Sequence, residues 1–344
     1  MSDVPDFVIV GENVHTTRVV RRNAPSVETD EQGREAIAFT DHEGRDCHLP
    51  VSEAERRTQE YEEGRIKHVR TAVRLAMEEG DDAEVALAYL RTLALSQVDA
   101  GAAYLDVNVD EVSLKLEEQK EGMRWLTELL APLSPVPLSI DSSNLEIIEA
   151  GMEVAGTQAG PPMLNSASLE RLEALGLAVA AGGPVIVTAA GDAGMPSSAE
   201  ERVENADRII AAALDRGIEI GRLYVDPLVF PIAVDGDFGD HCLDAIRALR
   251  ERYGPDIHIT GGMSNVSFGL PNRRLINDVF LVLAIEAGAD SGIVDPITNP
   301  PERAFALDRS ARPFELALDV LTGADRHCRA YVKAFRAGEL ELAA

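Results

Sequence analysis

The chain has 344 residues, of which 45% are hydrophobic, enough apolar material for one large domain with a sizeable core. Asp and Glu number 59 against 32 Lys and Arg, so the net charge of −27 would repel nucleic-acid phosphates and anionic membrane surfaces. The sequence therefore predicts neither a nucleic-acid partner nor a membrane partner.

Short apolar runs that close on a polar residue predict eight strands, at 7–13, 103–109, 137–141, 162–166, 184–190, 223–227, 258–263 and 291–296. Amphipathic stretches such as 199–217 and 240–254 lie between them and predict helices. Eight strands with helical connections and a C-terminal helical tail favour a (β/α)8 TIM barrel over an open sheet, since GENVHTT lacks the glycine-rich turn of a dinucleotide fold. We expect one domain that spans residues 1–344.

Residues 14–65 are too long for an ordinary connection after the first strand and predict an insertion. Within it, REAIAFT and RDCHLPVS flank the turn residues DHEG and predict a β-hairpin, which the charged segment SEAERRTQEYEEGR follows. Two interpretations remain open: a solvated flap of variable length, or a lid or docking surface at the mouth of the barrel.

The cysteines and the N-terminus predict a reducing compartment. Cys47, Cys242 and Cys328 are odd in number and far apart, so a disulfide framework is not expected. The opening residues SDVPDFVIV lack a basic region, and no apolar run reaches about 18 residues. We expect a cytoplasmic protein.

Polar residues that close the predicted strands are the candidates for chemistry, because a barrel collects its active site at the carboxyl ends of its strands. They are Glu12, Asn13, Asp106, Asn108, Asp141, Asn165, Asp226, Asn265 and Asp295. With no Lys or His among them, this set argues against Schiff-base chemistry. For any one position the alternative is a cap on the next helix. Together they suit a flat heterocycle with adjacent N–H donors, such as a pterin, although nucleobases and sugars present similar edges.

Several strings make the pattern specific: GEN (11–13), LDVNV (105–109), SIDSSN (139–144), MLNSAS (163–168), YVDPLVFP (224–231) and GGMSNVSFGLPNR (261–273). Together they resemble the methyltetrahydrofolate:corrinoid methyltransferases. That family belongs to the pterin-binding barrels, with dihydropteroate synthase and the folate module of cobalamin-dependent methionine synthase. The resemblance covers nearly all of the chain outside 14–65, but the fifth strand ends in TAAGDAGMP, where the family has a more polar string.

The resemblance implies roles for individual residues. Asp141, Asn165 and Asp226 would hold the pterin ring, with Asp106 and Asn108 in the same floor. Asn265 would approach N5, which carries the methyl group. The substrate-binding set is completed by Ser264, Glu12 and Arg273.

The reaction implied is methyl transfer between N5 of tetrahydrofolate and the cobalt of a corrinoid, supplied free or by a partner corrinoid protein. The tertiary amine N5 leaves poorly until it is protonated or strongly hydrogen-bonded. An amide that meets N5 as charge develops would stabilise the transition state, so we expect Asn265 to be the catalytic residue. Either direction of transfer fits the site. We further expect a homodimer.

Three alternatives compete with this interpretation. A dihydropteroate synthase would carry Arg and Lys in the seventh-strand loop, where this chain has Met263-Ser264-Asn265-Val266. A docking subunit that binds a pterin or a corrinoid protein without catalysis is the second. Metal catalysis is the third, but the His/Cys neighbours at 47–48, 241–242 and 327–328 do not have metal-ligand spacing, so no metal site is expected.

Overall fold

The computed structural model describes residues 5–156, 158–192 and 194–340. These residues form two compact units: an N-terminal unit of residues 11–165, and a C-terminal unit of residues 166–340 together with 5–10. Residues 1–4 and 341–344 of the expected domain lie outside the described residues. That the chain is one domain stays a prediction.

One sheet contains all eight predicted strands, in the order β12-β11-β10-β9-β8-β7-β1-β13. The strands are β1 (Val8–His15), β7 (Tyr104–Asn108), β8 (Leu138–Asp141), β9 (Met163–Ala167), β10 (Val185–Thr188), β11 (Leu223–Asp226), β12 (His258–Ile259) and β13 (Ser291–Val294). They are near-continuous runs of buried residues, as expected for parallel strands covered by helices.

The strand order closes on itself, because β13 at one end pairs with β1 and also with the residues just after β12 at the other end. The Val8 N–H donates to the Asp290 carbonyl (2.8 Å), and the Ile293 N–H donates to the Gly261 carbonyl just beyond β12 (2.9 Å). The last strand thus pairs with the first and also with the strand before it. The prediction of a (β/α)8 TIM barrel is confirmed.

Helices follow the strands in chain order. They are α3 (His68–Met77), α4 (Ala83–Asp99), α5 (Leu116–Leu130), α6 (Leu145–Met152), α7 (Ala174–Ala181), α8 (Ala199–Asp215), α9 (Phe238–Tyr253), α10 (Arg273–Ala287) and α11 (Pro301–Phe305). Local chemistry sets their ends: the Ser198 hydroxyl caps α8, and Gly254, with φ of +70°, ends α9. The predicted C-terminal tail is α12 (Arg312–Leu321) and α13 (Arg329–Arg336).

The inserted segment of the N-terminal unit contains two small sheets and two short helices. The predicted hairpin is confirmed as β4 (Glu35–Thr40) and β5 (Asp46–Pro50), and β3 (Val27–Thr29) extends it to three strands. A two-stranded sheet pairs β2 (Val20–Arg21) with β6 (Arg65–Ile66). The charged segment forms α1 (Glu53–Arg56) and α2 (Gln59–Glu62).

Both turns of the three-stranded sheet use the same residues, in the strings DEQGR and DHEGR. In each turn the aspartate, Asp30 or Asp41, accepts the backbone N–H of the arginine four positions later, at 2.8 and 2.9 Å. The same arginine, Arg34 or Arg45, returns its side chain to the aspartate. The glycine before it has φ of +78° or +83°, which only glycine adopts without strain.

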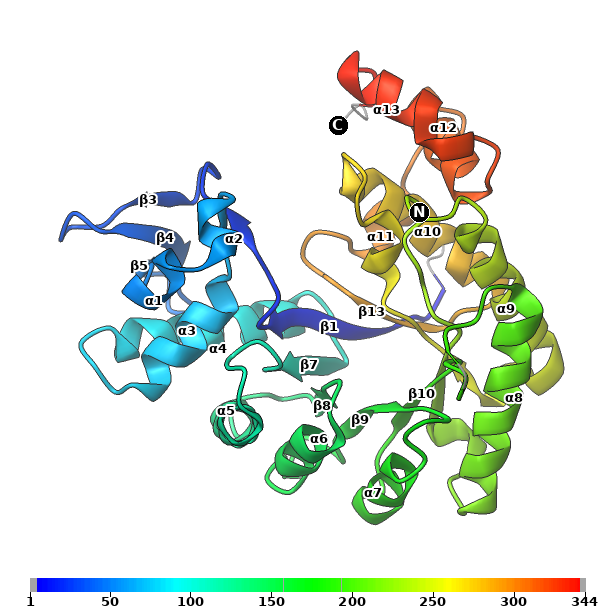
Figure 1. Cartoon of the computed structure of the whole chain (residues 1–344), viewed down its shortest axis with the longest axis horizontal. Helices are drawn as coiled ribbons and strands as arrows, with labels where there is room; N and C mark the ends of the chain where they lie inside the picture. Colours follow the sequence, from blue (N-terminus) through cyan, green and yellow to red (C-terminus); the bar gives the residue numbers. More distant parts are fainter. Residues whose placement is uncertain (1–4, 157, 193, 341–344) are drawn as a thin grey trace. The chain divides into compact units, whose positions relative to one another are not determined.

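The three-stranded sheet packs onto α4 within the N-terminal unit (Figure 1). Phe39 of β4 meets Tyr89 of α4 edge to face at 4.8 Å between ring centroids, and Leu49 of β5 is fully buried. Arg34 makes a two-pronged ion pair with Asp82 just before α4. The insertion is therefore anchored by both apolar and charged contacts.

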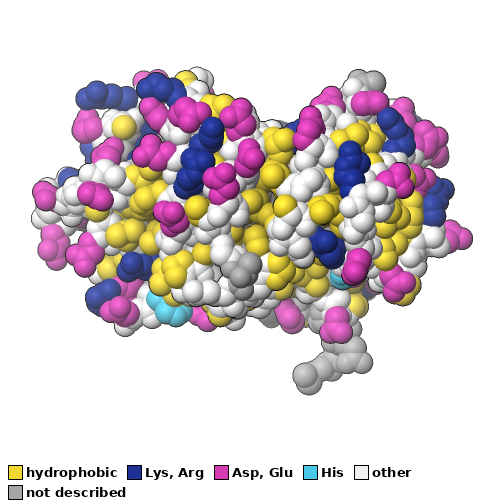
Figure 2. Space-filling view, turned by 90° about the horizontal axis from the view of Figure 1, so that it is seen from below, with side chains coloured by type: hydrophobic (Ala, Val, Ile, Leu, Met, Phe, Trp, Pro, Cys, Tyr) yellow, Lys and Arg dark blue, Asp and Glu magenta, His cyan; other side chains and the backbone are white. Residues whose placement is uncertain are grey.

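Acidic side chains outnumber basic ones in this chain. On the face in Figure 2, Asp and Glu side chains are spread among fewer Lys and Arg, in keeping with the net charge of −27. Among the described residues, no helix is both long enough and apolar enough to cross a membrane.

Candidate functional site

Three adjacent strands of the N-terminal unit place polar residues in one row. The strand register sets Asn108 of β7 opposite Asp141 of β8, and Asp141 opposite Asn165 of β9. Asp106 lies two residues before Asn108 and so points to the same side of the sheet. Four residues expected from the sequence are thus brought together.

Hydrogen bonds join this row in pairs. The Asn108 Nδ2 donates to Asp141 Oδ2 (2.8 Å), and the Asn165 Nδ2 donates to Asp106 Oδ1 (3.1 Å). Within the described residues, Asp141 Oδ1 and Asn165 Oδ1 have no hydrogen-bond partner in the chain. Both oxygens can therefore accept hydrogen bonds from a ligand.

One carboxyl group of the row, that of Asp106, is buried close to the charge of another, that of Asp141. Burial and the charge of Asp141 together raise the pKa of Asp106 to about 7, while the hydrogen bond from Asn165 works in the opposite direction. Its side chain is only 2% exposed. Asp106 can thus hold a proton near neutral pH.

His15 is a site residue that sequence reasoning missed. The first strand ends two residues later than predicted, so His15 is its last residue rather than part of the insertion. Its Nε2 lies 3.4 Å from Asp141 Oδ2. The expectation that no histidine closes a strand is therefore wrong. The alternation of β1 from Asn13 onward is the signal that could have found it.

Glu12 and Asn13 have partners outside the row. The Glu12 carboxylate accepts from Arg18 Nη1 (3.0 Å), and the Asn13 backbone N–H donates to the buried Gln97 side chain (2.8 Å). Gly11 is packed so closely that an added Cβ would lie 2.5 Å from Gln97 Oε1. Gln97 thus holds the GEN string in place from α4.

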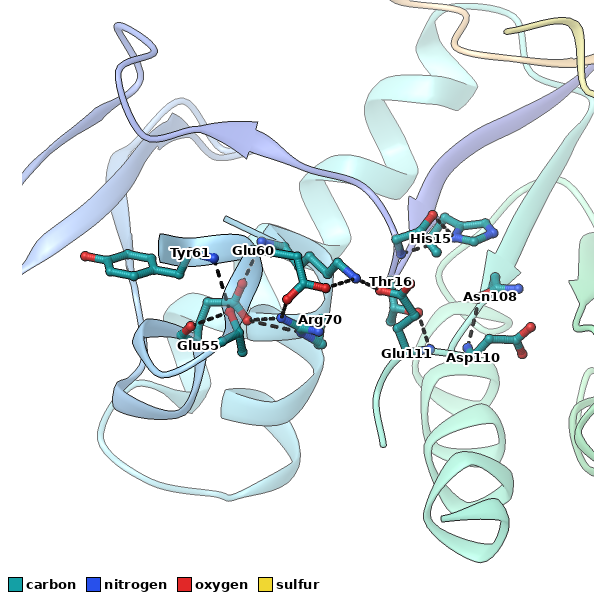
Figure 3. Close-up of polar contacts among 12 residues, drawn as sticks. His15, Thr16, Glu55, Glu60, Tyr61, Arg70, Asn108, Asp110 and Glu111 are labelled. Atoms are coloured by element: carbon teal, nitrogen blue, oxygen red, sulfur yellow. Dashed lines mark hydrogen bonds and ion pairs between the residues drawn. The ribbon is translucent and has the colours of Figure 1, made fainter. Parts of the chain in front are cut away.

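A polar network links the insertion to the strand ends in the same unit (Figure 3). Lys67 is 9% exposed, and its ammonium bonds to Glu60 of α2 at 2.9 Å and to Glu111 in the loop after β7. The Glu111 backbone N–H donates to Thr16 Oγ1 (3.1 Å), and the Thr16 N–H donates to the Asn108 carbonyl (3.1 Å). The insertion therefore braces the backbone that carries Asn108.

A second buried ion pair supports the same network. Arg70 of α3 contacts Glu55 of α1 at 2.7 Å, and the side chain of Glu55 is 1% exposed. Glu55 also accepts the Lys67 backbone N–H (2.8 Å). Since a buried charge is costly unless it is paired, this arrangement fixes α1 and the start of α3 together.

In the C-terminal unit, Asp226 closes β11. Its Oδ1 accepts the Leu228 N–H (2.7 Å), while within the described residues Oδ2 has no partner in the chain. Burial raises the pKa of Asp226 to about 6, against the lowering effects of the Leu228 N–H and the Arg202 charge. An added Cβ at Gly261 would lie 3.2 Å from Asp226 Oδ1, so glycine gives this carboxylate its space.

Asn265 lies in the short 3₁₀ segment η3 (Met263–Ser267) after β12. Its carboxamide makes no hydrogen bond to the described residues, so both its oxygen and its NH₂ group are open to a ligand. Arg273 at the start of α10 holds this segment: its Nη2 donates to the Ser264 carbonyl (2.8 Å) and its Nε to Ser267 Oγ (2.9 Å). The guanidinium also stacks on Phe268 at 4.2 Å.

Asp295 has a local role in the turn after β13, where its Oδ1 accepts the N–H groups of Ile297 and Thr298. The end of the fifth strand, TAAGDAGMP (188–196), contains Ala193, which lies outside the described residues. Among the described residues, no group of three or more His, Cys, Asp or Glu side chains could hold a metal ion.

A (β/α)8 barrel whose strands end in carboxylates and amides with open acceptor oxygens is an arrangement typical of enzymes, and its acceptors suit a donor-rich ligand. Residues 80–295 match the family described as pterin binding enzyme. A methylcorrinoid:tetrahydrofolate methyltransferase from Eubacterium limosum is 32% identical over 273 residues, 78% of this chain and 93% of that protein. The chain belongs to the pterin-binding enzyme family, and the resemblance found in its sequence is confirmed.

Two further likenesses are more limited. A methionine synthase from Mycobacterium leprae (strain TN) is 33% identical over 238 residues, which are 63% of this chain but 19% of that longer protein. A dihydropteroate synthase from Xanthomonas albilineans, solved with 7,8-dihydropteroate, has a TM-score of 0.50 at 20% identity, covering 66% of this chain and 86% of that chain. The second likeness concerns the fold alone.

Proposed function

We propose that this protein is a methyltransferase that moves a methyl group between N5 of tetrahydrofolate and the cobalt of a corrinoid. The observation that carries the proposal is chemical: Asp141, Asn165 and Asp226 each have an acceptor oxygen that no described residue uses. The relative from Eubacterium limosum, 93% of whose length is covered by the match, is named methylcorrinoid:tetrahydrofolate methyltransferase. That name supports the choice of substrates.

Each of these acceptors is suited to the donor edge of a pterin. A carboxylate can accept two parallel hydrogen bonds from a ring N–H and the adjacent amino group. Leaving Asp226 buried without such donors is costly, as its raised pKa shows. A pterin that donates to Asp226 would offset this cost, so part of the binding energy comes from relieving a buried charge.

Asn265 is the residue we assign to N5. Its carboxamide is uncommitted, and Arg273 and Ser267 hold the backbone segment that carries it. An NH₂ donor or amide oxygen that meets N5 as charge develops stabilises the transition state more than the ground state. Ser264 and Arg273 then act mainly by placing this segment.

The corrinoid is the second substrate, and we infer that a partner protein delivers it. In the C-terminal unit, the loops after β10, β11, β12 and β13 each carry an exposed large apolar side chain: Met195, Val234, Phe268 and Ile297. Apolar groups at loops that follow the strands suit contact with another protein. We also infer a cytoplasmic location and a homodimer; the free state of Cys47, Cys242 and Cys328 supports the first.

Single turnovers of 5-methyltetrahydrofolate with cob(I)alamin test the proposal, with methylcobalamin formation followed by absorbance. Titration with 5-methyltetrahydrofolate is run beside them. Folate binding without any methyl transfer in either direction would identify a docking subunit instead. Replacing Val234 with Asp should slow transfer with a corrinoid protein and spare transfer with free cobalamin.

A further inference from the structure

His15 is a site residue that the proposed reaction has not used. It closes β1, and its ring lies between two contacts: Nε2 at 3.4 Å from Asp141 Oδ2, and Nδ1 at 2.7 Å from Thr17 Oγ1. In Figure 3 its ring lies beside Asn108 and Asp110. A residue at the end of the first strand therefore contacts one of the three proposed pterin acceptors directly.

The partners of His15 assign the place of its proton. The Thr17 backbone N–H donates to Nδ1 (3.3 Å), so Nδ1 is an acceptor in the neutral ring. The proton of the neutral ring then lies on Nε2, which faces Asp141. Both protonation states of His15 thus present an N–H to the Asp141 carboxylate.

The contacts of Asp141 are all on one oxygen. His15 and Asn108 both approach Oδ2, and within the described residues Oδ1 is left without a partner. Two donors from two different strands fix the plane of the carboxylate. Oδ1 is thereby turned away from them and kept for a ligand.

His15 also faces three carboxylates: Asp141 of β8, Asp106 of β7 and Asp110 in the loop after β7. On its own strand, Glu12 is already paired with Arg18 at 3.0 Å. Burial alone would lower the pKa of His15, but the hydrogen bond and charge of Asp141 and the charges of Asp106 and Asp110 raise it above its ordinary value. The ring is thus readily protonated, and its charge offsets theirs.

We propose that His15 is a positioning residue for folate: it orients the Asp141 carboxylate toward the pterin and balances the negative charge of the three aspartates. This inference rests on the proposed function, because it presumes that Asp141 accepts hydrogen bonds from a pterin. Asn108 and His15 together would then set the angle at which the ring binds.

The test is a titration of 5-methyltetrahydrofolate from pH 5 to pH 9 with the parent protein, His15→Ala, His15→Gln and His48→Gln. His48 is the matched control, because it also bonds to a carboxylate, Glu28 at 2.6 Å, but does so on the small sheet. His15→Ala should bind about tenfold more weakly at pH 7, the scale of one hydrogen bond to a charged group. The acid limb of its plot of folate affinity against pH should move about 0.5 to 1 pH unit upward, since the charge of His15 lowers the pKa of Asp106 in the parent protein.

His15→Gln separates the two effects, because its side-chain NH₂ can still donate to Asp141 without carrying charge. It should recover affinity at high pH and keep the shifted acid limb. A merely structural role would lower folate affinity equally at every pH and leave the acid limb in place. That result would overturn the inference. Parent-like binding by both variants would overturn it as well. If the parent protein itself does not bind folate, the proposed function fails. If the parent binds folate and the His15 variants bind it equally well, only the role of His15 is overturned.

Discussion

The Asn265 carboxamide lies against the backbone of Gly262, so closely that a Cβ at residue 262 would sit 2.7 Å from Asn265 Nδ2. Gly262 has φ of −73°, a value that alanine also adopts, so Gly262→Ala changes space rather than backbone conformation. The added methyl should push the carboxamide aside. We expect kcat for methyl transfer to fall about tenfold or more, with folate affinity within about twofold of the parent.

Stopped-flow single turnovers beside a folate titration measure this effect. The control is Gly236→Ala in the loop after β11, where an added Cβ meets nothing within 4 Å. Unchanged transfer in Gly262→Ala would show that the carboxamide need not occupy its present position.

Removal of the carboxamide itself is the more direct change. Asn265→Ala should lower kcat, and kcat/KM with it, by about 10² to 10³, the scale for loss of one donor to a developing charge. Folate affinity should change little, because this group is expected to act mainly in the transition state. Transfer at the parent rate would remove Asn265 from the mechanism, whereas loss of folate binding in step with the rate would assign it a structural role.

Asp226→Asn should raise stability and weaken folate binding at the same time. The pKa of Asp226 is raised from 3.8 to about 6. Between these two pH values the folded protein therefore holds a proton on Asp226 that the unfolded chain has lost. Stability therefore falls as pH rises through about 4 to 6, and the charged form remains costly above that window. Asparagine keeps an oxygen for the Leu228 N–H without the charge.

Chemical denaturation at pH 7.5 should show a gain of about 1 to 3 kcal/mol for Asp226→Asn, and at pH 4 the gain should be small. Folate affinity at pH 7.5 should fall by about tenfold or more, since an amide cannot accept both pterin donors. A gain of equal size at both pH values would contradict the assignment of the cost to the carboxylate charge.

Lys67→Met tests the brace between the insertion and the strand ends. The Lys67 hydrogen bond holds the pKa of Glu60 down to about 2, so its stabilising effect is present above pH 4.5 and is lost as pH falls toward 2. The variant leaves Glu60 and Glu111 without their shared cation and should lose about 1 to 3 kcal/mol of stability at pH 7. Folate KM should rise, because the Glu111–Thr16–Asn108 backbone contacts loosen.

Thermal unfolding and folate saturation curves measure these two effects. Lys115→Met is the matched control, since Lys115 forms an exposed pair with Glu118 at 2.7 Å. A Lys67→Met protein with reduced stability and an unchanged folate KM would confine the brace to the fold.

Hydrophobic patterning was sufficient to predict the barrel strands, because parallel strands buried on both faces are unbroken apolar runs with polar ends. It also placed Asp106, Asn108, Asp141 and Asn165 at neighbouring strand ends, and their pairing follows from strand register. Which oxygen stays open could not be predicted, because that depends on side-chain contacts such as those on Asp141 Oδ2.

The ends of elements were the weaker part of the prediction. β1 continues to His15, and Asn13 and Val14 are both buried, so the polar residue Asn13 does not mark the end of the strand. In the insertion, the strand before DEQGR was missed, although DHEGR eleven residues later marks the same turn. The two partners of Lys67, Glu60 and Glu111, are far from each other in the sequence, so no local pattern indicates that they share one cation.

The twin Asp-x-x-Gly-Arg turns bear on the order in which the polypeptide gains structure during synthesis. Their hydrogen bonds join residues at most four positions apart, so closing them costs little chain entropy. Val8, by contrast, must wait for Asp290 to leave the ribosome before its strand gains that neighbour. The small sheet can therefore assemble on the emerging chain long before the barrel closes, and it gives the nascent protein a folded segment that covers the apolar face of α4.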